Sequence, residues 1–426
     1  MQSIRACFEL KTPNQNLIDF ILYDQKPFKY SFTPSNNAQL DDFIKKTISL
    51  KAFANKSETT PELFDLAYEQ LCALNRIARS ESDWIVYALY RCALQLYQIA
   101  VKLDTSAKNE DNNKPTSTSI NAISNPSLFY QKGDLRQDNF LTVCARVINS
   151  SLTICLQDRD LSASNKRHGA YFFGIIMFKI FNRLRAYELL NHIVNVLESR
   201  SDRLPPDEAF GNRRALTVAY SYYLGRYYTC RKKNYEKALQ WLELAFKNSH
   251  SKCSRQREQI LVYLLPVAFL KRRRFPTKKL LDSWDAKSTG LDYKSIFTAV
   301  LNGNLSQLDL IIESSKLSLL QRGLYLTFSE LKPYATLRLV RAAWVAVDCK
   351  WQVPTHVIAT AIKIKCSAPH PHPDDMMSQE NLDKEEQLDR TECQVAGLIS
   401  QGLIRGYLSH GNRVLVLSRT VPFPCN

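Results

Sequence analysis

The stretch that decides the fold runs from Leu388 to Pro424 and reads DRTECQVAGLISQGLIRGYLSHGNRVLVLSRTVPFP from Asp389 onward. It opens as a helix, because apolar residues recur at helical spacing on one face: Leu388, Val395, Ala396 and Ile399. Gly402 follows at the position of a C-terminal glycine cap. Leu403–Ser409 and Arg413–Ser418 then read as two strands, joined by a His-Gly-Asn turn that can supply positive φ. A helix followed at once by a β-hairpin predicts the second half of a winged helix.

Glycine usage separates this tail from the rest of the chain. The 426 residues contain only 12 glycines, none before Gly133, whereas four lie between Gly397 and Gly411. Long helices need few such breaks. A hydrophobic content of 45% with 23% charged residues is typical of globular proteins. The sequence therefore predicts a helical body followed by a tail that contains β-structure.

Cysteine usage and hydropathy bear on the compartment. The 11 cysteines are scattered, and no Cys-X-X-Cys pair occurs. This pattern favours buried free thiols in a reducing compartment over a disulfide framework. The sequence has neither an apolar run of transmembrane length nor the start of a signal peptide. We expect a cytoplasmic and nuclear protein that does not associate with a membrane.

Apolar runs and the breaks between them predict five regions. The segment 104–127 is rich in Ser, Thr and Asn without helical period, and we expect a disordered insertion there. The run DRLPPD, from Asp202 to Asp207, predicts a domain boundary. The expected regions are an N-terminal helical region (1–103), the insertion (104–127), helical repeats (128–205), the helical part of a C-terminal domain (206–335) and its winged-helix part (336–426).

A repeat signal lies in YYLGRYYTCRKKNYEKALQWLELAFKN, from Tyr222 to Asn248. Small and large residues there approximate one tetratricopeptide helix pair, with one extra residue in the turn: Leu224, Gly225, Tyr228, Tyr235, Ala238, Leu242 and Ala245. Gly225 permits close approach of the two helices. Apolar helical runs continue on both sides. The fold class that we predict is mainly α, a right-handed helical-repeat (TPR-like) solenoid that ends in a C-terminal winged helix.

The formal charge of +16 favours a polyanionic partner, either nucleic acid or an acidic protein. The alternative is that the chain simply has a basic, soluble surface. Cations at helix C-termini also have a purely structural explanation, their interaction with the helix dipole. The third helix of the tail carries more acidic than basic residues, which disfavours major-groove reading. The candidate anion-binding residues are Arg231, Lys232, Lys233, Lys271, Arg272, Arg273, Arg274, Arg405 and Arg419.

Catalytic motifs are absent from the sequence. No phosphate-binding glycine loop, dinucleotide fingerprint or nucleophile elbow occurs. His370, His372 and Asp383 match the zinc-ligand spacing of JAB/MPN-type metalloproteases, but Glu380 replaces the serine of that signature. Prolines bracket the histidines, so a solvated loop is the favoured interpretation. We therefore expect no catalytic residue, no metal site and no cofactor.

Helical repeats that run into one winged helix resemble the PCI domain of the proteasome lid, the COP-nine signalosome and eukaryotic initiation factor three. Four segments resemble the signalosome subunit twelve family, which groups with PCI subunits of TREX-type messenger-export complexes. They are YYLGRYYTCRKKNYEKALQWLELAFKN (222–248), ILVYLLPVAFL (260–270), VLNGNLSQLD (300–309) and RGYLSHGNRVLVLSRTVPFP (405–424). LIDFILYD (17–24) looks closer to signalosome subunit twelve than to the TREX-type subunits. The resemblance spans nearly the whole chain apart from the insertion.

The resemblance implies a non-catalytic scaffold whose winged-helix edge pairs with another PCI subunit. It also implies binding of a small, acidic, disordered protein that is shared with the proteasome lid. The second strand of the hairpin could supply a free apolar edge, with Val414 and Val416 on one side and Leu415 and Leu417 on the other. The partner-docking edge that we predict is Arg413, Val414, Leu415, Val416 and Leu417.

Three hypotheses of function follow. The first is a scaffold subunit of a signalosome-like complex that regulates cullin deneddylation. The second is a nucleic-acid-binding adaptor, contacting RNA or DNA, in transcription-coupled messenger processing and export with a second PCI protein and a small acidic subunit. The third is a zinc isopeptidase that uses His370, His372 and Asp383, and it is the least favoured.

Overall fold

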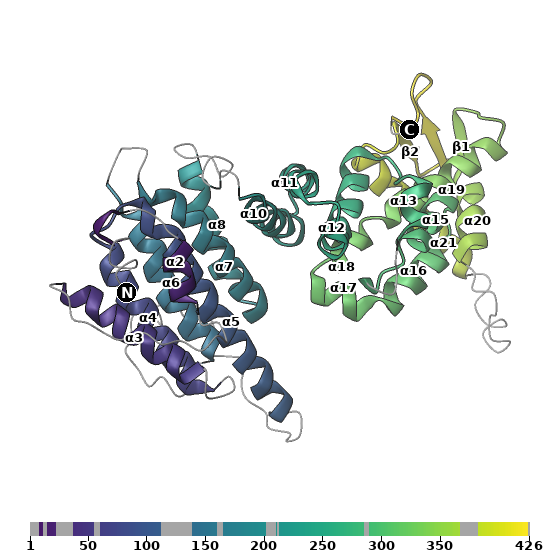
Figure 1. The fold of residues 1–426 in the computed structure, drawn as a ribbon. Coiled ribbons are helices and arrows are strands. Elements are labelled where there is room, and N and C mark those ends of the chain that lie inside the picture. Colours follow the sequence, from purple (N-terminus) through teal and green to yellow (C-terminus); the bar gives the residue numbers. More distant parts are fainter. Residues whose placement is uncertain are drawn as a thin grey trace. The chain divides into compact units, whose positions relative to one another are not determined.

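The structure is a computed structural model that describes residues 8–11, 15–22, 37–54, 60–111, 139–159, 165–201, 210, 213–284, 289–366 and 382–424. The chain forms two compact units, Met1–Tyr223 and Leu224–Asn426 (Figure 1). Each unit is mainly helical and has its own core. No helix among the described residues is long and apolar enough to cross a membrane.

The first unit is a stack in which each helix from α3 to α8 packs against its neighbour along the chain. Its most apolar helix, α7, buries Phe172, Phe173, Phe178 and Phe181. The helices are α2 (Gln15–Ile21), α3 (Ala38–Ala54), α4 (Pro61–Ala78), α5 (Val86–Asp111), α6 (Phe140–Leu156), α7 (Gly169–Leu184) and α8 (Tyr187–Ser201), with the 3₁₀ turns η1 (Asp83–Ile85) and η4 (Lys166–His168).

Helix α5 corrects one predicted limit. It continues to Asp111, so residues 104–111 are helical and do not belong to a disordered insertion. Thr105 and Ser106 are exposed there and donate hydrogen bonds to carbonyls of the preceding turn. Exposed polar residues such as these carry no apolar period, which is why the pattern did not reveal this part of the helix. The remainder of the expected insertion lies outside the described residues, as do residues 202–207 at the expected boundary.

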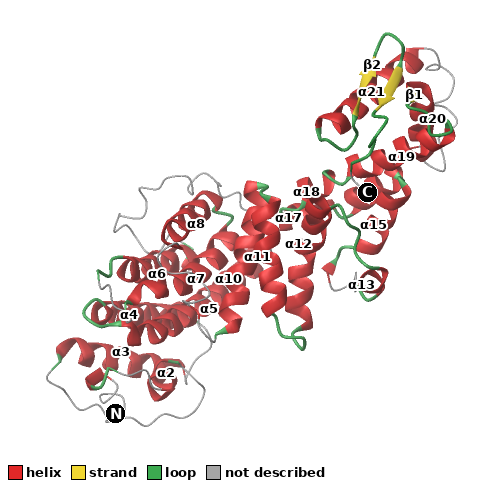
Figure 2. Cartoon of the chain, turned by 90° about the horizontal axis from the view of Figure 1, so that it is seen from above, coloured by secondary structure: helices red, strands yellow, loops and turns green. Residues whose placement is uncertain are grey.

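The second unit continues the helical repeats and adds a small sheet (Figure 2). Helix α10 begins before residue 224 and ends within this unit. The helices are α10 (Arg214–Tyr227), α11 (Tyr235–Asn248), α12 (Ser254–Arg272), α13 (Lys278–Asp282), α15 (Tyr293–Asn302), α16 (Leu305–Ser314), α17 (Lys316–Arg322), α18 (Tyr325–Ser329), α19 (Lys332–Ala346), α20 (Thr355–Cys366) and α21 (Leu382–Ser400), with the π-helical turn η5 (Tyr228–Lys232).

The predicted helix pair of the repeat is confirmed. A Cβ placed on Gly225 would lie 2.5 Å from Cγ of Leu242, so only glycine allows α10 to approach α11 this closely. Ala238, Leu242 and Ala245 are fully buried on the facing side of α11. The extra residue of the turn lies in η5, because a π-helical turn contains one residue more than an α-helical turn.

The last part of the chain is a module of three helices, α19 to α21, and three strands. The strands are β1 (Gln352–Pro354), β2 (Gly406–Ser409) and β3 (Val414–Leu417). Helix α21 is followed by a cap at Gly402, whose φ is 66°, and then by the β2–β3 hairpin. Both features agree with the sequence prediction. The core face of α21 is shifted from the expected one, because Leu398 is buried and Ala396 is exposed. The module's core combines Val340, Val353, Ile358, Val395, Leu398, Leu415 and Leu417.

Candidate docking surface of the C-terminal module

The strand order corrects the predicted docking edge. The sheet is antiparallel with the order β1-β3-β2, so β3 is its central strand. Val414 to Leu417 therefore face a neighbouring strand on both sides and offer no free edge. The predicted edge was wrong because the sequence did not reveal strand β1. This strand pairs with β3, with Gln352 opposite Val416 and Pro354 opposite Val414. Only three residues long and ending in proline, β1 has no pattern that would predict a strand.

The free edges of the sheet belong to β2 and β1. Within the described residues, β2 pairs with β3 alone, through the register from Gly406 opposite Leu417 to Ser409 opposite Val414. The amide of Ser418 donates to the carbonyl oxygen of Arg405. Because backbone groups alternate in direction along an antiparallel strand, those of Gly406 and Leu408 point away from β3. An incoming strand could therefore pair with β2.

The two faces of β3 differ as the sequence predicts. Leu415 and Leu417 are buried in the module core, whereas Val414 and Val416 lie half-buried on the opposite face. Tyr407 shares that outer face with Val416, and its side chain is 62% exposed. Trp351, just before β1, is 42% exposed, and the guanidinium of Arg419 lies 4.9 Å from its ring centroid. The outer face is thus partly apolar and bordered by a cation.

Four charged or titratable side chains attach the β2–β3 turn to α21. Arg413 Nη1 lies 2.5 Å from Oδ1 of Asp389 and 2.9 Å from Oε2 of Glu392. Nδ1 of His410 lies 2.6 Å from the same Glu392 oxygen. The hydroxyl of Thr355 donates to the other Glu392 oxygen, at 3.4 Å. Glu392 is buried at this contact.

The electrostatics of this group favour an ionised carboxylate. Burial raises the pKa of Glu392, but hydrogen bonds from His410 and Arg413, together with the charge of Arg413, outweigh it, so the pKa is lowered from its ordinary value. Asp389, Glu392 and His410 are close enough to share a cation, and Arg413 already supplies one. The group therefore acts as an ion-pair clamp on the turn.

Several predicted anion-binding cations have carboxylate partners. Lys271 pairs with Glu236 at 2.9 Å, Arg272 with Glu243 at 2.7 Å and Lys233 with Glu330 at 3.2 Å. Arg273 lies near Tyr334, whose hydroxyl donates to the carbonyl oxygen of Leu270. The other predicted members are exposed: Arg231, Lys232, Arg274, Arg405 and Arg419. The structure divides the set between the ends of α10 and α12 and the borders of the sheet. The ion pairs of Lys233, Lys271 and Arg272 are exposed, and exposed ion pairs contribute little to stability.

The structure does not describe the side chains that were predicted at zinc-ligand spacing. His370 and His372 lie outside the described residues, as does the side chain of Asp383. The residues that sequence reasoning missed are Trp351, Tyr407 and the partners of Arg413. Alternation in Gly406–Ser409 could have identified the exposed tyrosine. The pairing of Glu392 with Arg413 depends on how the hairpin folds back on α21.

Fold and surface together define a helical-repeat protein with a small helix-and-sheet module at its C-terminal end. A relative from Eremothecium gossypii, COP9 signalosome complex subunit 12, is 42% identical over 428 residues, which cover 100% of this chain and 98% of the relative. Relatives of the same name from Kluyveromyces lactis and Saccharomyces cerevisiae are 32% and 31% identical, over 99% of this chain and 98% of each relative. No family model matches. The chain belongs to the COP9 signalosome complex subunit 12 family.

Proposed function

We propose that this protein is a non-catalytic PCI scaffold subunit of a signalosome-like complex that regulates cullin deneddylation in the cytoplasm and nucleus. Its family membership along the full chain supports a role as a subunit. The C-terminal module would be the winged-helix half of the PCI domain, and its partner would be another PCI-domain subunit. The cationic helix ends of the second unit suit a small acidic, disordered protein as a further partner.

The observation that carries the docking part of this proposal is the outer edge of β2. Strands that present unpaired backbone groups add a strand from another chain readily. The β2 edge is short, and Tyr407 beside it offers an exposed aromatic anchor of the kind enriched at interfaces. Leu415 and Leu417 then stabilise the sheet from behind and do not contact the partner.

The test is affinity purification with mass spectrometry of the wild-type protein and of Tyr407→Lys. A lysine on an edge strand opposes strand addition, so we expect the PCI partner to be lost from the variant. Gln401→Lys is the matched control. Gln401 is exposed at the end of α21, so this substitution adds the same positive charge outside the sheet. Retention of the partner by Tyr407→Lys, or equal loss in both variants, would contradict docking at β2.

A second candidate function is a nucleic-acid adaptor in messenger processing and export. Exposed Lys232, Arg274 and Arg405, and Arg419 stacked on Trp351, favour contact with phosphates and bases. Binding of a single-stranded RNA should then weaken steeply with salt and fall in Trp351→Ala. Binding that is absent, or insensitive to salt, would argue against this function. An eluate that holds one PCI partner with splicing or export factors would favour it over the signalosome.

A further inference from the structure

The loop between α12 and α13 combines a cluster of cations with an exposed hydroxyl group. The stretch KRRRFPTKK, from Lys271 to Lys279, carries six basic residues in nine positions. The dipole of α12 accounts for cations in its last turn, Lys271 and Arg272, but not for Arg274 beyond the end of the helix. Helix stability therefore does not explain why positive charge continues toward Thr277.

The chain is extended and anchored within this loop. Residues 273–277 lie outside any helix or strand, after α12 has ended at a left-handed residue, Arg273. Pro276 restricts the residue before it to extended conformations. That residue is Phe275, whose ring centroid lies 4.8 Å from the ring centroid of Phe269 in the core of the second unit. The aromatic contact holds the extended segment in place.

Thr277 presents a free hydroxyl group on this segment. The residue is exposed, and its φ of −66° and ψ of 144° are extended. Its carbonyl oxygen accepts hydrogen bonds from the amides of Leu280 and Leu281, whereas its side chain makes no cap on α13. Within the described residues, no group forms a hydrogen bond with this hydroxyl. The oxygen is therefore accessible to an enzyme.

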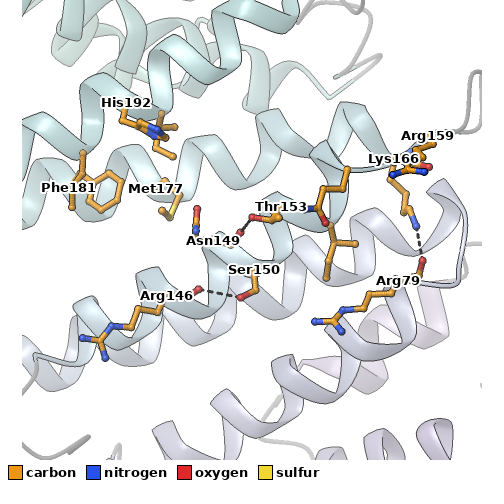
Figure 3. Close-up of a pocket in the computed structure, with 15 residues that line it drawn as sticks. Arg79, Arg146, Asn149, Ser150, Thr153, Arg159, Lys166, Met177, Phe181 and His192 are labelled. Carbon is orange, nitrogen blue, oxygen red and sulfur yellow. Dashed lines mark hydrogen bonds between the residues drawn. The ribbon is translucent and has the colours of Figure 1, made fainter. Parts of the chain in front are cut away.

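Hydroxyl groups inside helices are held differently. On α6 the hydroxyl of Ser150 donates to the carbonyl oxygen of Arg146, at 3.4 Å, and the hydroxyl of Thr153 donates to that of Asn149, at 2.8 Å (Figure 3). A hydroxyl in the middle of a helix reaches the active site of a kinase only after the helix unwinds. Thr277 needs no such change, because its segment is already extended.

We propose that Thr277 is phosphorylated by a basophilic protein kinase of the class that recognises arginine three and five residues before the acceptor. Arg274 and Arg272 occupy these positions, and the same arrangement before a Ser or Thr occurs nowhere else in the sequence. A guanidinium pairs with a carboxylate of the kinase through two hydrogen bonds. Arg274 is exposed and forms no ion pair with any described residue. The pair of Arg272 with Glu243 is exposed, so its replacement costs little.

The reaction transfers the γ-phosphoryl group of ATP. Oγ1 of Thr277 attacks the γ-phosphorus, the bond to the bridging oxygen breaks and ADP leaves, while the hydroxyl proton passes to the catalytic aspartate of the kinase. The product carries a charge of about −1.5 to −2 at pH 7. This charge lies beside Arg274 and Lys278 in the chain and offsets part of the positive charge of the loop. Phosphorylation therefore lowers the affinity of the loop for anions, independently of docking at β2.

The test is phosphorylation of the full-length protein by a purified kinase of this class with ATP and Mg²⁺, with the modified residue located by mass spectrometry. Phosphate should appear at Thr277 and be absent from Thr277→Ala. Arg274→Ala should lower the initial rate about tenfold or more, because it removes a charge-assisted pair with the kinase. Arg255→Ala is the matched control. It removes the same charge at the other end of α12, where Arg255 is exposed, and should leave the rate unchanged.

Two further measurements separate this site from general charge. Thr217 follows Arg213 and Arg214, but it is buried on α10 and should stay unmodified in the folded protein. On a heparin column the phosphorylated protein should elute at lower salt than the unmodified protein. Absence of phosphate at Thr277, equal modification of Thr217, equal rates for the two arginine variants, or unchanged elution from heparin would overturn the proposal. Circular dichroism confirms that each variant is folded.

Discussion

At the scale of the residue, Glu392 connects helix α21 to the β2–β3 turn of the C-terminal module. It is buried on α21, accepts hydrogen bonds from Arg413 and Thr355, and lies against His410. A buried carboxylate is tolerated only when it is paired in this way. Because Arg413 and His410 belong to the β2–β3 turn and its flank, the charge of Glu392 determines where the hairpin lies on the helix.

The lowered pKa of Glu392 predicts a pH dependence. Its folded pKa lies below the unfolded value, about 4.3 for a glutamate. The carboxylate therefore stabilises the module above that pH, and this contribution is lost as pH falls through the lower, folded pKa. Between about pH 6 and pH 3 the wild-type melting temperature should fall more than that of Glu392→Gln. Thermal melts of both proteins across this range measure the difference.

The matched control lies on the same helix. Arg390 and Glu386 form an exposed pair at 2.7 Å, four residues apart. Arg390→Gln should leave the melting temperature and its pH dependence nearly unchanged, because an exposed pair contributes little. Arg413→Gln should instead destabilise the module and move the acid transition to higher pH. Equal behaviour of the two arginine variants would refute the role assigned to Glu392.

At the scale of the element, the contact between α10 and α11 depends on one missing side chain. Gly225→Ala would place a Cβ against Leu242 and 3.3 Å from its backbone nitrogen. The helices must then separate, and we expect the second unit to lose about 1–3 kcal/mol of unfolding free energy. Urea denaturation monitored by circular dichroism measures this loss.

Gly397 provides the control for that substitution. It lies inside α21, and a Cβ there would meet nothing within 4 Å. Gly397→Ala should be neutral or stabilise by up to about 1 kcal/mol, since alanine is the better helix former. If both glycine substitutions had the same effect, helix propensity would account for the result, and close packing of α10 on α11 would not.

At the scale of the whole molecule, the division into two units predicts local unfolding. Leu190 on α8 is 2% exposed in the core of the first unit, and Leu190→Ala should cost about 2–5 kcal/mol. If each unit unfolds cooperatively on its own, protection of amide hydrogens should fall in the first unit alone. Hydrogen exchange with mass spectrometry distinguishes this from a uniform loss, which would show that the chain unfolds as one body.

Local patterns predicted most of the helices, because the spacing of apolar residues along the chain reflects burial of one helix face. The Leu-Gly pair at residues 224–225 predicted a close helix contact, and the alternation of Val414 to Leu417 predicted which side chains of β3 enter the core. The end of α5 was not predicted, because its exposed polar residues have no apolar period. Strand β1 was missed for a similar reason, since three residues are too few to show a pattern.

The amino-acid sequence by itself determined the mainly helical class, the helix and hairpin at the C-terminal end, and the family. These follow from periodicity, glycine positions and residue identities, all of which are local. Only the tertiary structure decided that β3 is the central strand and that Arg413 binds Asp389 and Glu392. Such features join residues far apart in the chain, and no spacing along the sequence encodes which of them meet once the core has packed.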